Sequence, residues 1–500
     1  MAFQQILKGT LLPKVPLKTL FEEDNSKESN ELVAYKAPEK YASNAESTGG
    51  KAPFIKIGGQ IVKEIESMTI DETSFIPTIT LIFRDGFGEF AGDRFPKTNM
   101  IMNVYVKVGT DKLKPIRCDF LITSMKSIPT RYTGERKGVA IDQMYTVKGE
   151  LYVPGIYSNI SKSYSSLNSK DALKSICETL GLGFAENEST PNDKMTWINT
   201  NMSTLSFMKT ILEHSYQDDD SFFSGFIDKY YYLNYVEVNK QLRADEADST
   251  FVTAQRPLQK GFTQAVKDSA TTAAIEEATM VNYLTTELQY KGSNNYITSA
   301  NLMSDQGEVI KRQGYQKRIY YYDHLKTAQA PKEKIKDFFV ESLNSQDRDP
   351  NFFLVPEEVS LANHTVKKWM NIDYGNAHPE WNAARLINTH NLKELEKIRL
   401  RVALKGINFQ AIRGSFIPVL ITVQRAEHIM KATEKLGDTD LTESRKPSVD
   451  ALTDQVTDLQ LSGYYYISGA KYHYDINHPE GFYTEFFLSR REWRPSKKTE

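Results

Sequence analysis

Two groups of side chains in this chain are of the types that hold metal ions. His473 and His478, with Asp475 between them, could supply ligands to zinc, and the aspartate run 218–220 could supply oxygens to a harder cation. His473, however, lies in an alternating strand pattern, and His478 precedes Pro479 at the tip of a predicted hairpin. Consecutive aspartates diverge in an extended segment, and no loop of spaced oxygen ligands follows them. The sequence therefore predicts a solvated turn at 218–220, and neither a metal nor another cofactor.

The glycines Gly86, Gly88 and Gly92 are spaced almost as in a phosphate-binding loop. The third comes one residue late and no apolar-periodic helix follows, so the dinucleotide-binding geometry is not predicted. GxSxG, HExxH and Gly-Lys-Ser/Thr motifs do not occur in the sequence. We therefore predict that the protein is not an enzyme and that no residue is catalytic. Single carboxylates such as Glu72 and Glu485 could still pair in space.

Three basic side chains, Lys397, Arg399 and Arg401, alternate with apolar residues and so fall on one face of a predicted strand. The simplest interpretation of that face is a solvated surface. If the strand lined a channel, the same side chains would meet passing DNA or a neighbour's carboxylates, so they are the candidate channel-lining residues. The net charge of only -2 gives no bulk attraction to nucleic acid or to an anionic membrane.

Length and composition indicate an ordinary globular protein. Five hundred residues predict two to four domains with several cores. Apolar residues make up 40% of the chain and charged residues 25%, while 27 Tyr and 25 Phe favour strand-rich structure. Cys118 and Cys177 are predicted to be buried free thiols, as expected of a reducing cytosol. Neither a signal peptide nor a membrane-spanning run is evident, so we expect a soluble protein that is not conventionally exported and not inserted in a membrane.

The strands that must position these side chains fall into two similar stretches far apart in the sequence. The matched segments are 78–84 with 397–404, 102–108 with 417–423, 120–124 with 465–469, and 145–154 with 486–495, which sets Tyr152 opposite Trp493. Both stretches show period-two alternation and turns punctuated by glycine, as expected of a small barrel or sandwich. A chain with two such units could build a ring of six similar units from three copies.

The segment between the two units is mixed. We predict a helix at 169–180 capped by Ser169 and ended by Gly181, a helix at 203–216, and strands at 222–228 and 230–238. A further helix is predicted after Pro331. The fold class is therefore α+β, mainly β, with two barrel-like domains and interposed mixed α/β domains. The predicted divisions are a flexible N-terminal arm at 1–53, a first barrel at 54–160, a mixed α/β domain at 161–243, a linker with a β-rich and helical domain at 244–378, a second barrel at 379–495 interrupted by an insertion at 427–460, and a tail at 496–500.

At this point the residues resemble a known family. The run 169–238 carries Leu180-Gly181-Leu182, Trp197-Ile198-Asn199, His214-Ser215-Tyr216 and the aromatic strand 230–235; later come Pro379-Glu380-Trp381, Leu404-Lys405-Gly406, Ile412-Arg413-Gly414-Ser415 and 463–467. In order and spacing these resemble the late control protein D and baseplate hub family of contractile-tailed phages, which is also the hub half of type VI secretion VgrG spikes. The resemblance covers about 54–495.

The resemblance implies a homotrimer that caps a contractile tail tube. Two tube-like barrels per chain would present six similar units to a hexameric ring of tail tube protein, while the opposite face would keep threefold symmetry for a central spike. It also implies neighbouring baseplate wedge proteins, transient passage of DNA, and a place in the virion's tail baseplate after assembly in the host cytoplasm. The side chains in the matched turns are the candidate contacts to the tube or to a neighbouring subunit: Arg94, Phe95, Arg413 and Phe416.

The chain also departs from the VgrG pattern. It ends soon after Pro495, which leaves no room for a spike-base domain, so the spike is expected to be a separate polypeptide. The insertion and the N-terminal arm lie beyond the core pattern. Two alternatives stay open: a β-rich cell-wall hydrolase or carbohydrate-binding tail component, which needs a carboxylate pair in an aromatic cleft, and a tube or sheath terminator, which needs six copies.

Overall fold

The computed structural model describes most of the two barrel-like stretches and the mixed segment between them. The described ranges are 53–106, 116–132, 140–187, 189–218, 220–243, 284–286, 296–304, 377–378, 380–396, 398–407, 413–421, 461, 463–479 and 481–490, with the backbone of five short strands, β1 (Lys18–Thr19), β16 (Gln316–Lys317), β17 (Ile335–Asp337), β18 (Val340–Glu341) and β19 (Lys367–Trp369). Most of the predicted arm, the insertion at 427–460, the tail and Lys397 lie outside them. The expected class, α+β and mainly β, is confirmed.

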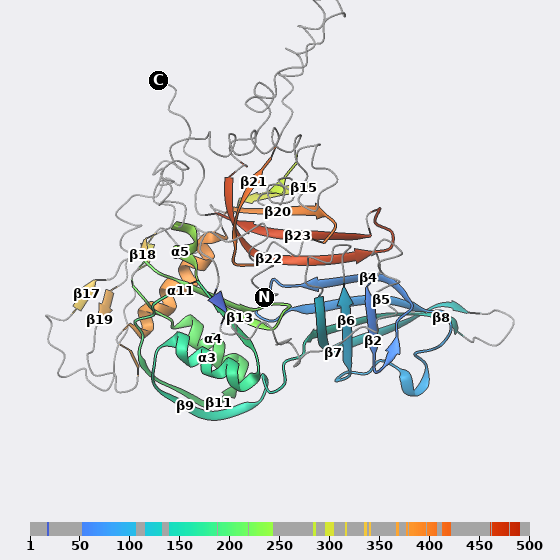
Figure 1. The fold of residues 1–500 in the computed structure, drawn as a ribbon, viewed down its shortest axis with the longest axis horizontal. Helices are drawn as coiled ribbons and strands as arrows, with labels where there is room; N and C mark the ends of the chain where they lie inside the picture. The colour runs from blue at the N-terminus through green and yellow to red at the C-terminus, as the bar shows by residue number, and fades with distance from the viewer. Residues whose placement is uncertain are drawn as a thin grey trace, which may run out of the picture.

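One large sheet dominates the structure (Figure 1). Its strands in spatial order are β15 (Ile297–Ser304), β20 (Ile398–Lys405), β23 (Phe482–Ser489), β22 (Gly463–Asp475), β4 (Glu64–Asp71), β5 (Thr78–Asp85), β8 (Ala140–Leu151), β7 (Ile116–Tyr132), β6 (Ile101–Val106), β2 (Phe54–Ile57) and β3 (Gln60–Ile61), with β21 (Phe416–Leu420) beside β22 and β14 (Leu284–Thr285) beside β21. Segments from opposite ends of the chain thus share one hydrogen-bonded surface.

Alternation of side chains along each strand decides which face of this sheet is buried. Leu81 and Phe83 of β5 and Leu400 and Val402 of β20 are at most 1% exposed, while their neighbours on the other face are partly exposed. Successive side chains of a strand point to opposite faces, so each strand contributes one apolar row to a core. At roughly 1.5–3 kcal/mol for each fully buried apolar side chain, these rows are the main stabilising contribution of the strands.

The two stretches have the same strand order. In the first, the order β5-β8-β7-β6 runs antiparallel throughout, and β4 flanks β5. In the second, the order β20-β23-β22-β21 is also antiparallel throughout, and β15 flanks β20. The outermost pairs differ, because β2 runs antiparallel to β6 whereas β14 runs parallel to β21. Five strands therefore repeat in order and direction.

A β-bulge marks the same place in both units. The pairing of β7 with β8 shifts at Thr123, and the pairing of β22 with β23 shifts at Ser468. At each bulge the extra residue's hydroxyl donates to a carbonyl of the partner strand: Thr123 to Lys148 at 3.3 Å and Ser468 to Phe487 at 2.9 Å. A bulge is a specific device that bends and twists a sheet, so its recurrence confirms the predicted match of 120–124 with 465–469.

A second bulge repeats in the flanking strands. The pairing of β4 with β5 shifts at Glu66, and that of β15 with β20 shifts at Thr298. In each case the residue before the bulge lies opposite an equivalent core position, Phe83 in β5 and Leu404 in β20. The strand β15 is therefore the counterpart of β4, although the sequence placed 297–304 in the intervening domain rather than in the second barrel.

The match of the last strands needs correction. Relative to the bulges, Val147 and not Tyr145 corresponds to Phe486, because Met125 pairs with Val147 and Ala470 pairs with Phe486. The predicted match of 145–154 with 486–495 is thus displaced by two residues, which the sequence could not detect because a shift of two leaves the apolar face unchanged. The first pair is displaced by two residues in the opposite sense, since Thr78 corresponds to Arg399 and not to Lys397.

The mixed segment forms a compact α/β layer beside the first unit (Figure 1). It comprises β9 (Asn159–Leu167), α3 (Ser169–Leu180), β10 (Gly183–Glu186), β11 (Met195–Ser203), α4 (Thr204–Glu213), β12 (Phe223–Ile227), β13 (Tyr232–Glu237) and α5 (Val238–Arg243). Gly181 ends α3 in the left-handed region at φ 71, as predicted. The cap of α3 is Asn168 rather than Ser169, because the Asn168 side chain accepts from the Asp171 amide.

Two elements near the second unit differ from expectation. Residues assigned to the start of the second barrel form α11 (Trp381–Leu395), which packs against α4 in the α/β layer. The helix predicted after Pro331 is wrong, because β17 pairs with β19 and β18 with β16, so strand pairing overrides the helical spacing of the apolar residues there.

A short 3-10 turn, η2 (Gly92–Arg94), follows β5. None of the described helices is both long and apolar enough to cross a membrane.

Candidate subunit interface

The two repeated units are joined by a strand pair, β4 with β22. The ladder runs antiparallel from Lys471 opposite Asp71 to Asp475 opposite Ser67. It is extended at both ends, by the Glu72 amide donating to the Ala470 carbonyl at 2.8 Å and the Ile476 amide donating to the Glu66 carbonyl at 3.0 Å. The second unit thus continues the first unit's sheet without a gap.

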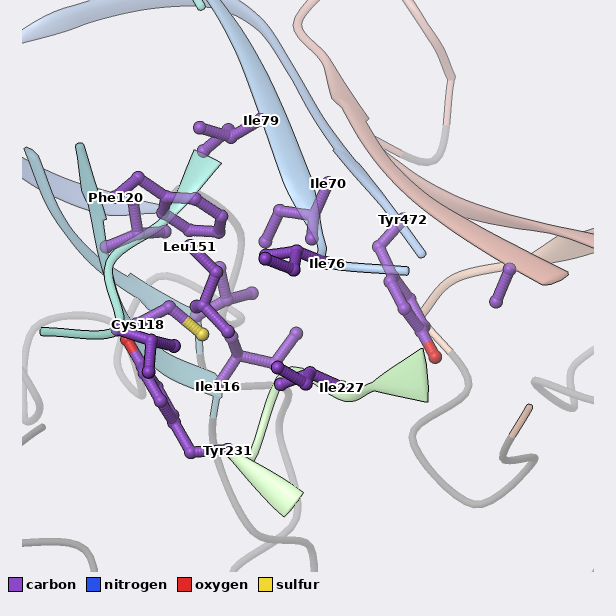
Figure 2. Close-up of a cluster of buried hydrophobic side chains, with 14 of the residues drawn as sticks. Ile70, Ile76, Ile79, Ile116, Cys118, Phe120, Leu151, Ile227, Tyr231 and Tyr472 are labelled. Atoms are coloured by element: carbon purple, nitrogen blue, oxygen red, sulfur yellow. The ribbon is translucent and has the colours of Figure 1, made fainter. Parts of the chain in front are cut away.

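The buried face of this junction is shared by three parts of the chain. Ile70 of β4, Ile227 of β12 and Tyr472 of β22 belong to one core cluster and are at most 1% exposed. Figure 2 shows them together with Cys118 of β7 and Tyr231 of the β12–β13 turn. Cys118 and Cys177 are both buried and free, as predicted. Burial raises the pKa of both thiols above the ordinary value.

An ion pair lies next to that core, in contact with Tyr472. The Lys229 ammonium is 3.2 Å from the Glu72 carboxylate and donates to the Tyr472 hydroxyl at 2.8 Å. The side chains of Lys229 and Glu72 are 1% and 3% exposed. Burial opposes the charge on Lys229, but the adjacent Glu72 carboxylate raises the pKa of Lys229 above its ordinary value. The group joins the first unit, the α/β layer and the second unit at one point.

Backbone contacts complete the same junction. The other Glu72 oxygen accepts from the Lys229 amide at 2.8 Å, and Asp228 accepts from the amides of Tyr230 and Tyr232. Burial raises the pKa of Asp228 to about 6. Tyr231 between them adopts φ 64, a left-handed conformation that is strained for a residue other than glycine. The turn is therefore held in shape by its carboxylate neighbours.

The outward face of the junction carries charged side chains that are paired across strands. Lys471 lies 2.8 Å from Asp71, and one Arg401 guanidinium nitrogen donates to both Glu485 oxygens at 2.6 and 2.8 Å. His473 lies 3.3 Å from the same carboxylate. Hydrogen bonding by His473 and Arg401 lowers the pKa of Glu485 to about 2. This face is polar but close to charge balance.

The candidate channel residues lie on that outward face. Arg399 and Arg401 alternate with buried residues of β20, and the Arg401 side chain is 50% exposed. Because Arg401 already binds Glu485, much of its charge is compensated within the chain. Arg401 would therefore attract the phosphates of passing DNA less strongly than an unpaired arginine would.

The structure separates the four residues predicted as contacts. Arg94, the last residue of η2, is exposed, and Phe95 packs edge-on against Tyr145 with ring centroids 5.8 Å apart. Arg413 instead donates to the carbonyls of Glu72 and Ser74 and stacks over Phe226 at 4.3 Å. Phe416 is 7% exposed. The first pair lies at the surface of its unit, and the second lies against the internal junction.

The groups singled out for chemistry have structural partners. Glu72 and Glu485 are not brought together, because each faces its own cation. Asp218 accepts from the amides of Asp220 and Ser221, so its carboxylate is occupied by local backbone groups, while Asp219 lies outside the described residues. His473 stacks on the Tyr483 ring, and the His478 ring packs against the same tyrosine at a tilt. Within the described ranges, three metal-binding side chains nowhere gather into a site.

Sequence reasoning missed Lys229 and the role of β15. The only sequence signal for Lys229 is its place beside Asp228, in a turn between two aromatic strands. β15 gives a weaker signal, because its side chains are mostly polar or exposed and 93 positions separate its end from the start of β20 in the chain numbering.

Comparison with known proteins gave matches to solved structures only. The sequence matches no family model, and no curated protein matches it. A tail protein from Neisseria meningitidis is 10% identical with a TM-score of 0.45, and the match covers 88% of this chain and 96% of that one. The 43 kDa tail protein of prophage MuSo2 from Shewanella oneidensis is 9% identical with a TM-score of 0.45, covering 88% and 97%. An E. coli type VI secretion component, described as similar to T4 bacteriophage tail proteins gp27 and gp5, is 10% identical with a TM-score of 0.38, covering 88% and 79%. These three solved structures are two phage or prophage tail proteins and a type VI secretion component.

Proposed function

We propose that the protein is a structural baseplate hub that forms a homotrimer at the end of a contractile tail tube. The observation that carries this proposal is the internal repeat: five strands in the same order and direction, with bulges at the same two places. Two independent domains with unrelated tasks have no physical reason to share bulge positions. Two units that fill equivalent places in a ring need the same strand curvature, which is a physical reason to share bulge positions.

Symmetry supplies the mechanism. A ring of three copies contains six units of similar shape, so one of its faces can match a hexameric ring of tail tube protein. The parts that do not repeat, chiefly the α/β layer and α11, occur three times and suit the threefold central spike. Baseplate wedge proteins would meet the outer surface, and DNA would pass through the middle during genome ejection. The hub would act in the virion's tail baseplate after assembly in the host cytoplasm.

A hub needs rigid contacts rather than catalysis. Glu72, Glu485 and Asp71 are each paired with a cation of the same chain, which suits cohesion between parts and not proton transfer. In the proposed ring, Arg94 and Phe95 would contact the tube or a neighbouring subunit. Arg413 and Phe416 would hold the second unit against the α/β layer, and Arg399 and Arg401 would face the channel with Lys397.

The experiment is the mass of the purified protein in solution by light scattering. The proposal expects three times the chain mass of 57.0 kDa at micromolar concentration. A stable monomer, or a hexamer of the kind that a tube terminator forms, would overturn it. A peptidoglycan zymogram separates the hydrolase alternative, since a hub produces no clearing.

A further inference from the structure

The strand β22 uses one of its edges twice. Its start, through Tyr466, pairs with β21, and its later part, from Lys471 to Asp475, pairs with β4 on the same edge. The opposite edge of β22 pairs with β23 along most of its length. The junction between the two units is therefore built on the second half of a long strand.

The strand β7 is the counterpart of β22, and no strand of the described ranges pairs with the corresponding half of its edge. Its first part pairs with β6, from Ile116 to Leu121, and its other edge pairs with β8. Beyond Ile122, β6 and its neighbours provide no further partner strand among the described residues. Lys126 and Pro129 on this stretch are exposed.

The strand β15 is the counterpart of β4, and it is the last strand at its end of the sheet. It pairs with β20 only, within the part of the chain that the structure describes. Most of its residues are exposed, and the Met303 side chain is 43% exposed. An exposed strand edge is a template for pairing with another chain.

We infer that β15 of one copy pairs antiparallel with β7 of a neighbouring copy, in the register that joins β4 to β22 within the chain. This inference rests on the proposed function, because it requires several copies in a ring. The bulges fix the equivalences: Ile128 corresponds to His473, and Asn301 corresponds to Thr69. Since His473 lies opposite Thr69 in the junction, Ile128 of one copy lies opposite Asn301 of the next.

The side chains fit this pairing. In the register so fixed, Ser127 faces Leu302 on the side that is buried at the internal junction, where their counterparts Tyr472 and Ile70 belong to the core. Leu302 is only partly buried in the single chain, although it packs against the core cluster. Contact with a neighbouring copy would cover it.

The backbone groups also fit, with one exception. Glu66 of β4 and Glu72 just after it direct their backbone groups at β22, so the even-numbered residues of β4 form that ladder. By equivalence the even-numbered residues of β15 point at its open edge. Pro129 of β7 has no amide to donate there, but its carbonyl can accept from Ala300. The ladder between copies therefore has one hydrogen bond fewer than the internal one.

The pairing closes the ring. The internal junction β4–β22 and the junction β15–β7 between copies would alternate around it, and three copies would give six similar junctions. Each copy would offer β15 on one side and β7 on the other, which is a head-to-tail contact that closes by rotation. Closure would cover both of these open edges of the large sheet.

Cysteine cross-linking tests the register. The variant carrying Ile128→Cys and Asn301→Cys places two thiols directly opposite across a non-hydrogen-bonded pair, where Cα atoms are roughly 4.5 Å apart, within disulfide reach. In one chain β15 and β7 are seven strands apart in the sheet order, so a disulfide links different copies. Mild oxidation should give covalent trimers on a non-reducing gel. The native thiols Cys118 and Cys177 are buried and do not compete.

The control shifts the register by one. Ile128→Cys with Leu302→Cys places the thiols on opposite faces of the sheet and should cross-link at least tenfold less. A second pair, Lys126→Cys with Met303→Cys, lies on the same face as the first and should cross-link equally well. If light scattering shows a trimer and neither matched pair cross-links, the strand register is wrong while the hub proposal stands. A monomeric wild-type protein would overturn both.

Discussion

The Lys229 ammonium lies 3.2 Å from the Glu72 carboxylate in an interior where both side chains are at most 3% exposed. The two residues come from different parts of the chain, the β12–β13 turn and the segment after β4. Taking both charges out of water is costly, and their mutual attraction together with the Tyr472 hydroxyl offsets that cost. This pair ties the α/β layer to the seam between the repeated units.

Removing one partner should be far worse than removing both. Lys229→Met should lower the free energy of unfolding by about 3–5 kcal/mol, because it removes the ammonium that pairs with the buried Glu72 carboxylate. Lys229→Met combined with Glu72→Leu should recover most of that loss. Urea denaturation of the three variants measures it, and losses that simply add up in the double variant would contradict the pairing.

Glu237 predicts a loss of stability as the pH rises. Burial raises the pKa of Glu237 from an ordinary 4.5 to about 7. A carboxyl with a raised pKa in the folded state contributes stability that is present below pH 4.5 and lost as the pH rises through 7. Glu237→Gln should flatten this dependence, which spans on the order of 3 kcal/mol between those pH values. Denaturant titrations of the wild type and of Glu237→Gln at pH 4.5 and 7.5 measure the free energy of unfolding. If it changes by the same amount between the two pH values in both proteins, the assignment to Glu237 is contradicted.

Glu485 predicts the opposite dependence. Its pKa is lowered to about 2, so its contribution is present above pH 4.5 and lost as the pH falls toward 2. Glu485→Gln should therefore be less stable than the wild type at neutral pH and should approach it in acid. The Glu66→Gln variant is a matched control, because Glu66 also pairs with an arginine, Arg84, across the sheet. A Glu485→Gln variant that destabilised equally at both pH values would contradict the pairing with Arg401 and His473.

The hydrogen bonds of Asn388 should hold α11 against the α/β layer. Its side-chain amide donates to the carbonyls of Leu212, Glu213 and Ser215 at the end of α4, and its oxygen accepts from the Phe223 amide. Asn388→Ala would leave these buried groups without a partner and should cost about 1–3 kcal/mol. Hydrogen exchange should speed up at the Phe223 amide but not at the Ile122 amide in the first unit. Unchanged exchange at Phe223 would show that other contacts hold the helix.

The sequence predicted the repeat better than the junction that uses it. Alternating apolar residues and glycine turns locate a strand, and the match of 120–124 with 465–469 set the register of the long strands correctly. The match of 145–154 with 486–495 was displaced by two residues, so that Val147 and not Tyr145 corresponds to Phe486. A shift of two keeps the same side chains on the apolar face, so the alternation gave no sign of it. β15 could not be assigned to the second unit, because only half of its residues are apolar and its partner β20 lies far along the chain.

The ion pair was beyond sequence reasoning for a related physical reason. Glu72 and Lys229 are 157 positions apart, and each alone looks like an ordinary surface charge. Only the packing of three parts removes them from water together. The same holds for Arg413, whose match to Arg94 in a turn gave no indication that it donates inward to the Glu72 carbonyl.

The most direct test of the central claim is the symmetry of the assembled particle. Averaged electron-microscope views down the axis should show a ring of six similar densities together with three distinct ones contributed by the α/β layers, one for every two ring densities, so that the whole has threefold symmetry. A ring with true sixfold symmetry, or particles in which the two units of one chain do not occupy neighbouring places around a common centre, would contradict it.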